Sequence, residues 1–94
     1  MENLLPIGSI VQVGNSDALV MITGYYPYAE NDAYDYLGVF YPIGFRSAGK
    51  VFLMKEETIT KVLFRGYETE ASNRFLAGIA AMNEEYEKRQ KTEQ

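Results

Sequence analysis

The stretch GYYPYAENDAYDYLGVFYPIG, residues 24–44, is the most informative part of the chain, because it holds six of its eight tyrosines. Two aromatic runs flank a polar segment, 29–33, which predicts two strands joined by a mobile hairpin loop. Alternation along the second strand separates its side chains into two faces. One face carries Tyr34, Tyr36, Gly38 and Phe40, and the other carries Asp35, Leu37, Val39 and Tyr41.

Two interpretations of this tyrosine-rich strand remain open at the level of the sequence. In the first, Leu37, Val39 and Tyr41 form the core, and Tyr34 and Tyr36 cover a sheet face, since aromatic residues favour strands. In the second, Tyr34 and Tyr36 form a partner-binding surface, because tyrosine offers contact area and a hydroxyl and is enriched where proteins meet.

The rest of residues 5–67 has a similar composition, rich in Val, Ile, Tyr and Phe, with Gly and Pro at intervals. Gly24, inside the expected strand 18–26, marks a bulge or a sharp bend. Val62 and Phe64 are expected on the inner face of the last strand, and residues 55–58 form a single helical turn. The expected strands are 9–13, 18–26, 34–41, 51–54 and 59–67. Five short antiparallel strands with tight turns predict a small bent sheet or an SH3-like barrel.

Residues 69–90 change in character and predict one amphipathic α-helix, capped by Thr69 or Ser72. The predicted fold is therefore α+β, mainly β, and residues 1–94 form a single domain with a frayed tail at 91–94. An apolar stripe runs along the helix at spacings of four, three and four, made by Phe75, Ile79, Met82 and Tyr86.

This stripe also has two interpretations. Burial against the sheet of the same chain is the default for an amphipathic helix. A helix of this length exceeds what a small barrel covers, so we expect Phe75 to be structural and the outer residues, Met82 and Tyr86, to bind a partner.

Composition excludes several classes of function. The net charge is −4, and no basic run exists, which argues against nucleic acid and against an anionic membrane as partners. Without His or Cys the chain lacks the commonest general base, the thiolate nucleophile and the usual zinc ligands. The acidic residues Glu30, Asp32 and Asp35 lack the ligand rhythm of a calcium loop. We therefore expect no catalytic residue, no cofactor site and no metal site, and a cytoplasmic location.

Four blocks of the strand region carry a family resemblance: LPIGSIV (5–11), VMITGYY (20–26), YDYLGVFYPIG (34–44) and ITKVLFRGYE (59–68). They resemble a family of small proteins of once-unknown function, encoded in type VII (ESX-like) secretion loci of Gram-positive bacteria beside toxins with an LXG domain. The resemblance implies a non-enzymatic cytoplasmic accessory or chaperone. Such a protein binds the N-terminal LXG region of a toxin, with small helical secretion partners, and helps to target the toxin for export.

Two alternatives stay open beside this targeting role. An immunity protein that neutralises a toxin also suits an acidic chain, since an acidic surface can cover a basic active site. An SH3-like module that binds peptides or nucleic acid is the other, although nucleic acid requires a basic stripe that this sequence does not have.

Overall fold

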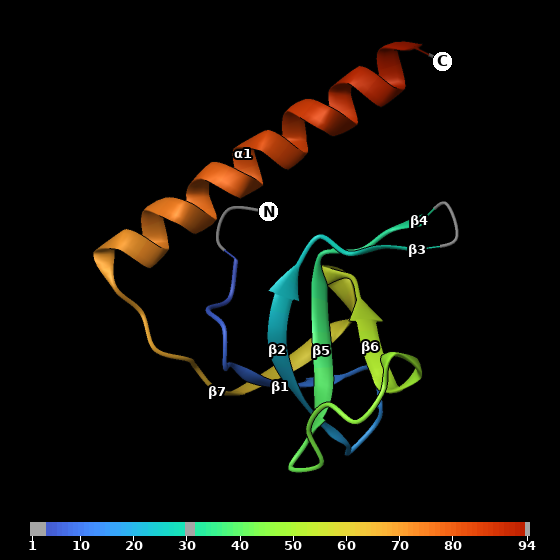
Figure 1. The fold of residues 1–94 in the computed structure, drawn as a ribbon, viewed down its shortest axis with the longest axis vertical. Helices are drawn as coiled ribbons and strands as arrows, with labels where there is room; N and C mark the ends of the chain where they lie inside the picture. Colours follow the sequence, from blue (N-terminus) through green and yellow to red (C-terminus); the bar gives the residue numbers. More distant parts are fainter. Residues whose placement is uncertain (1–3, 30–31, 94) are drawn as a thin grey trace. The chain divides into compact units, whose positions relative to one another are not determined.

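The computed structural model describes residues 4–29 and 32–93, which fall into two compact units. One unit is Leu5–Tyr67 and contains every strand. The other contains Leu4 and the chain from Glu68 onward, which is almost entirely helix. Figure 1 shows the strands in blue to yellow and the helix in orange to red.

The larger unit is built on a five-stranded antiparallel sheet with the order β6-β5-β2-β1-β7. Together with one C-terminal helix it confirms the predicted class, α+β and mainly β. The five strands are β1 (Ile10–Val13), β2 (Leu19–Tyr25), β5 (Tyr36–Tyr41), β6 (Val51–Met54) and β7 (Ile59–Phe64). The register of β2 on β5 shifts between Ile22 and Gly24, so the bulge expected at this glycine is present.

The connections differ in part from the prediction. The polar segment after β2 adds a small two-stranded ladder, β3 (Tyr28–Ala29) with β4 (Asp32–Ala33), and residues 30–31 lie outside the described chain. A 3₁₀ helix, Glu56–Thr58, occupies the position of the expected helical turn. A second one, Ala48–Lys50, precedes β6. The turn after β5 contains a cis Tyr41–Pro42 bond and ends at Gly44, whose φ is 78°.

Most of the core of the sheet unit lies on the face that carries Tyr36, so the expected assignment for β5 is wrong in part. Val39 is buried as expected, at 5% exposed. Tyr36 is 0% exposed, whereas Tyr41, expected in the core, is 51% exposed. The registers place Val11 opposite Val20, and Tyr25 opposite Tyr36, on this face. Fully burying each aliphatic side chain stabilises the fold by about 1.5–3 kcal/mol. The core-facing residues include Val11, Val20, Ile22, Tyr36 and Met54.

Gly38 explains why this face became the core. A Cβ atom at Gly38 would lie 2.6 Å from Cγ1 of Val20 and 2.8 Å from Cε of Met54. The side chains of the neighbouring strands therefore fill the space above Gly38, and a bulkier residue there would push them apart. Gly38, two positions from Tyr36 and from Phe40, is thus part of the packing of this sheet.

Tyr25 and Tyr36 hold the backbone of Leu5 between them. The Leu5 N–H donates to the hydroxyl of Tyr36 at 3.0 Å, and the hydroxyl of Tyr25 donates to the Leu5 carbonyl at 2.5 Å. Their ring centroids are 5.9 Å apart. Both polar groups of a buried residue are thereby satisfied by side chains that belong to the sheet. Two of the clustered tyrosines are needed to hold the segment that leads into β1.

The segment before β1 is also joined to the end of β7. The hydroxyl of Ser9, which is fully buried, donates to the Pro6 carbonyl at 2.8 Å and accepts from the Gly66 N–H at 3.0 Å. The backbones approach so closely that a Cβ at Gly66 would lie 2.1 Å from the carbonyl oxygen of Ile7. Gly66 is therefore required by close backbone packing.

β7 is an edge strand without a buried face. Ile59 is half-buried, and every residue from Thr60 to Phe64 is exposed, so the expected inner position of Val62 and Phe64 is wrong. The ladder with β1 shifts register twice, which interrupts the alternation of side chains. The strand also ends at Phe64 rather than at residue 67.

Helix α1 spans Glu70–Glu93, a length of 24 residues. Thr69 caps it: its hydroxyl accepts from the Ser72 N–H at 2.9 Å, and the Ser72 hydroxyl accepts from the Thr69 N–H at 2.8 Å. This reciprocal arrangement is a capping box in which serine takes the place of the usual Glu or Gln.

Candidate binding surfaces

The structure separates the four residues predicted to bind a partner. Tyr36 is a core residue, so its assignment to a binding surface is wrong. Tyr34 is half-buried, with the Lys55 ammonium 5.7 Å from its ring centroid. Met82 and Tyr86 lie on helix α1 and are 71% and 53% exposed.

The predicted apolar stripe of the helix is largely exposed. Phe75 is 62% exposed, which contradicts its expected structural role and makes it similar to Met82 and Tyr86. Ile79 is half-buried, and Leu76, one position away from Phe75, is buried. At 100° per residue Phe75, Met82 and Tyr86 fall on one side of the helix. We call these three residues the helix stripe.

A second apolar surface lies on the sheet, where β1, β2, β5 and β7 contribute residues. It is a shallow groove of about 390 Å³, and its apolar lining continues the exposed face of the edge strand. Phe64 and Leu63, which line it, are 61% and 45% exposed. The lining residues are Gly8, Ile10, Met21, Tyr41, Leu63 and Phe64.

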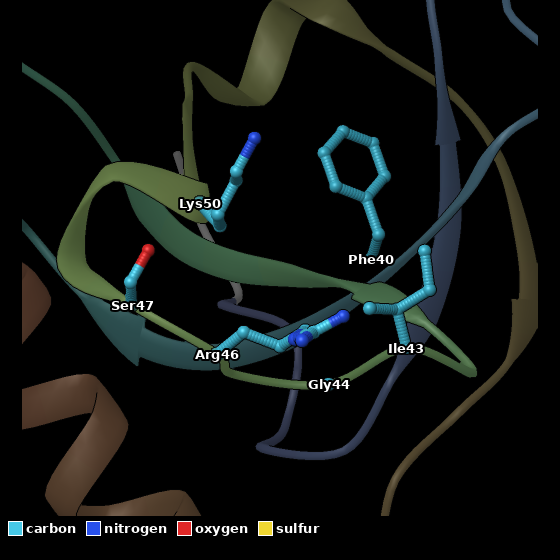
Figure 2. A pocket seen from close by; sticks show the side chains of 6 residues that line it. All are labelled: Phe40, Ile43, Gly44, Arg46, Ser47 and Lys50. Atoms are coloured by element: carbon cyan, nitrogen blue, oxygen red, sulfur yellow. The ribbon is translucent and has the colours of Figure 1, made fainter.

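A third site lies where β5 enters the loop that leads to β6. It is a pocket of about 640 Å³ lined by Phe40, Ile43, Gly44, Arg46, Ser47 and Lys50 (Figure 2). Phe40 and Tyr41 are successive strand residues, so their side chains point to opposite faces. This pocket, hereafter the loop pocket, is therefore separate from the sheet groove. Sequence reasoning missed it, although the absence of any acidic residue between Asp35 and Glu56 marked the region.

The acidic residues near the β3–β4 ladder have partners within the protein. Asp32 pairs with Lys55 at 3.5 Å, and the carboxylate of Asp35 accepts from the Glu56 N–H at 2.6 Å. Glu30 lies outside the described residues. Across the described chain, no group of three or more His, Cys, Asp or Glu side chains is arranged to hold a metal ion.

The hydroxyls of Tyr36, which is buried, and Tyr25, which is half-buried, have shifted pKa values. Burial raises the pKa of Tyr36 well above its usual value of 10, with a smaller contribution in the same direction from the Glu56 and Asp35 carboxylates. The hydrogen bond from the Leu5 N–H acts in the opposite direction. Burial also raises the pKa of Tyr25. These groups stay protonated at neutral pH and serve the fold.

Together these observations define a small α+β protein, mainly β, whose surface displays large apolar side chains on the sheet and on the helix. A family model described as Domain of unknown function (DUF4176) matches residues 4–75, so the chain belongs to this family. The match includes the whole sheet and ends in the first turns of α1, before Met82 and Tyr86. The comparisons found no match among curated proteins or among solved structures. No helix in the described part of the chain has the length and apolar character needed to cross a bilayer.

Proposed function

We propose that this protein is a non-enzymatic cytoplasmic accessory that binds the N-terminal LXG region of a type VII secretion toxin and helps to target it for export. The observation that carries the proposal is the helix stripe, three large apolar side chains that are each more than half exposed. Contiguous exposed apolar residues mark sites where proteins meet. The resemblance of the four strand blocks to proteins encoded beside LXG toxins supplies the identity of the partner.

The chemistry of the stripe suits a protein partner. Phe75 and Tyr86 bring aromatic rings, and Met82 brings a flexible thioether that adapts to an irregular surface. An apolar stripe on a helix binds a groove or a second helix through residues spaced by three, four and seven. The LXG region, with small helical secretion partners, is the occupant we assign to this stripe.

Co-purification with the two halves of an LXG-domain toxin, expressed separately, tests the proposal. We expect the full chain to retain the N-terminal LXG half and not the C-terminal toxic half. Capture of the C-terminal half alone would instead identify an immunity protein. If the protein retains neither half but binds nucleic acid or an unrelated peptide, the SH3-like module is favoured.

A matched pair of helix variants locates the interface. Met82→Asp places a charge in the stripe, and we expect it to abolish co-purification with the LXG half. Ala77→Asp places the same charge on the opposite side of the helix, at another exposed position, and should leave binding intact. Circular dichroism spectra of both variants should match the native spectrum. Equal loss of binding in both variants would contradict a role for the stripe.

A further inference from the structure

The loop pocket combines two cations with exposed apolar side chains. Arg46 and Lys50 line it with Phe40 and Ile43, which are 37% and 66% exposed. Figure 2 shows Phe40 and Lys50 projecting to the same side of the loop, with the Arg46 side chain extended toward Ile43. A ligand in this pocket therefore meets positive charge and apolar surface together.

Both cations lack a partner within the described protein. The chain is acidic, yet residues 36–55 contain Arg46, Lys50 and Lys55 and no Asp or Glu. Lys55 pairs with Asp32. Within residues 4–29 and 32–93, no ion pair or side-chain hydrogen bond engages Arg46 or Lys50. The loop pocket is thus a local region of uncompensated positive charge on an acidic protein.

The mixture of charge and apolar surface selects the class of ligand. Nucleic acid requires many cations along a stripe, and two cations on a chain of net charge −4 do not supply that. A simple inorganic anion would use the cations and leave the ring and the aliphatic side chain exposed. A peptide segment with a carboxylate beside an apolar side chain uses both, because Arg binds carboxylates through two parallel hydrogen bonds and apolar contacts fill the remainder.

We propose that the loop pocket binds an acidic, apolar segment of a protein partner, in which an Asp or Glu pairs with Arg46 and Lys50 and a neighbouring apolar side chain packs on Phe40 and Ile43. This inference deepens the proposed function, on which it rests for the identity of the partner, the toxin's LXG region. The pocket lies on the sheet unit and the stripe on the helix, so the two surfaces are tested separately.

A peptide titration followed by NMR tests the pocket without the toxin. The probes are N-acetyl-Leu-Glu-Phe-amide and its Gln counterpart, added to the uniformly labelled full chain. We expect the Glu peptide to shift amide resonances of residues 40–50 and the Gln peptide to bind about tenfold more weakly, as expected for a lost charge-assisted contact. Equal shifts from the two peptides, equal shifts from inorganic phosphate, or shifts confined to other residues would overturn the proposal.

Charge-removing variants supply the second measurement. The double variant Arg46→Gln, Lys50→Gln should bind the Glu peptide and the LXG half about tenfold more weakly than the native protein. Its binding should also depend less on salt concentration. Lys61→Gln removes one exposed cation from β7, outside the pocket, and should change either affinity less than about twofold. Ile43→Ser, at an exposed position, tests the apolar part and should weaken binding a few-fold.

The two measurements distinguish the failure of this inference from the failure of the proposed function. If the LXG half binds the native protein and the double variant equally well, the proposed role of the loop pocket is wrong and the targeting role stands. If the Glu peptide binds as expected and the LXG half does not bind at all, the pocket stands and the targeting role is wrong.

Discussion

Replacing Tyr36 by phenylalanine tests whether a tyrosine hydroxyl holds the N-terminal segment on the sheet. The ring stays in the core, and only one oxygen is lost. That oxygen accepts the Leu5 N–H at 3.0 Å in a fully buried environment, so the substitution leaves a buried donor without a partner. Such a loss costs about 1–3 kcal/mol. A chain of 94 residues has a free energy of unfolding of roughly 5–14 kcal/mol, so the change is a substantial fraction.

The assay is equilibrium urea unfolding together with thermal melts of the full chain. One kcal/mol lowers the melting temperature of a domain of this size by about 4–8 °C, so we expect a drop of roughly 5–20 °C for Tyr36→Phe. Tyr28→Phe is the matched control. Tyr28 is 64% exposed, so loss of its hydroxyl should change the free energy of unfolding by less than about 0.5 kcal/mol. Equal unfolding free energies for the two variants would refute the structural role assigned to the Tyr36 hydroxyl.

Three further predictions follow from the same packing. Gly66→Ala should lower the free energy of unfolding, measured in urea, by at least about 1–3 kcal/mol, because its Cβ would overlap the carbonyl of Ile7. Gly49→Ala is the control and should be nearly neutral, because no atom lies within 4 Å of a Cβ at that position. Thr69→Ala should lower stability by about 1 kcal/mol through the lost cap, measured by the helical signal in a thermal melt. The raised pKa of Tyr36 means that its proton stabilises the fold fully below about pH 10 and that this contribution is lost as pH rises further, so native protein should lose more stability above pH 10 than Tyr36→Phe does. Equal alkaline losses in the two proteins would contradict this last expectation.

The local pattern of the sequence predicted most of the fold. β6 begins and ends as expected, and the glycine of β2 marks a bulge, because strand propensity and glycine placement act over a few residues. The core of β5 was predicted only in part. Val39 is buried as expected, but Tyr41 is exposed and Tyr36 is buried, since alternation separates two faces without indicating which one is covered. That choice depends on Gly38, which allows Val20 and Met54 to come together from neighbouring strands.

The candidate sites were less predictable than the fold. The exposure of Met82 and Tyr86 agrees with the expectation for the outer helix, yet Phe75 is exposed as well, because an apolar stripe indicates a buried or bound face without naming what covers it. The loop pocket depends on a turn that brings Phe40, at the end of a strand, to Arg46 and Lys50. Such an approach is a property of the tertiary fold, and the absence of acids in the segment was its only sequence signal.

The junction between Ser9 and Gly66 also determines how the sheet unit responds to mechanical force. The chain enters and leaves the unit at one place, beside the Ile10–Phe64 end of the β1–β7 ladder. Tension applied between residues 5 and 67 therefore loads an antiparallel pair from a single end, and its rungs break one after another rather than together. Single-molecule pulling between these positions should open β7 first, with the force resisted by the contacts of Leu5 and by the hydrogen bond between the Ser9 hydroxyl and the Gly66 amide.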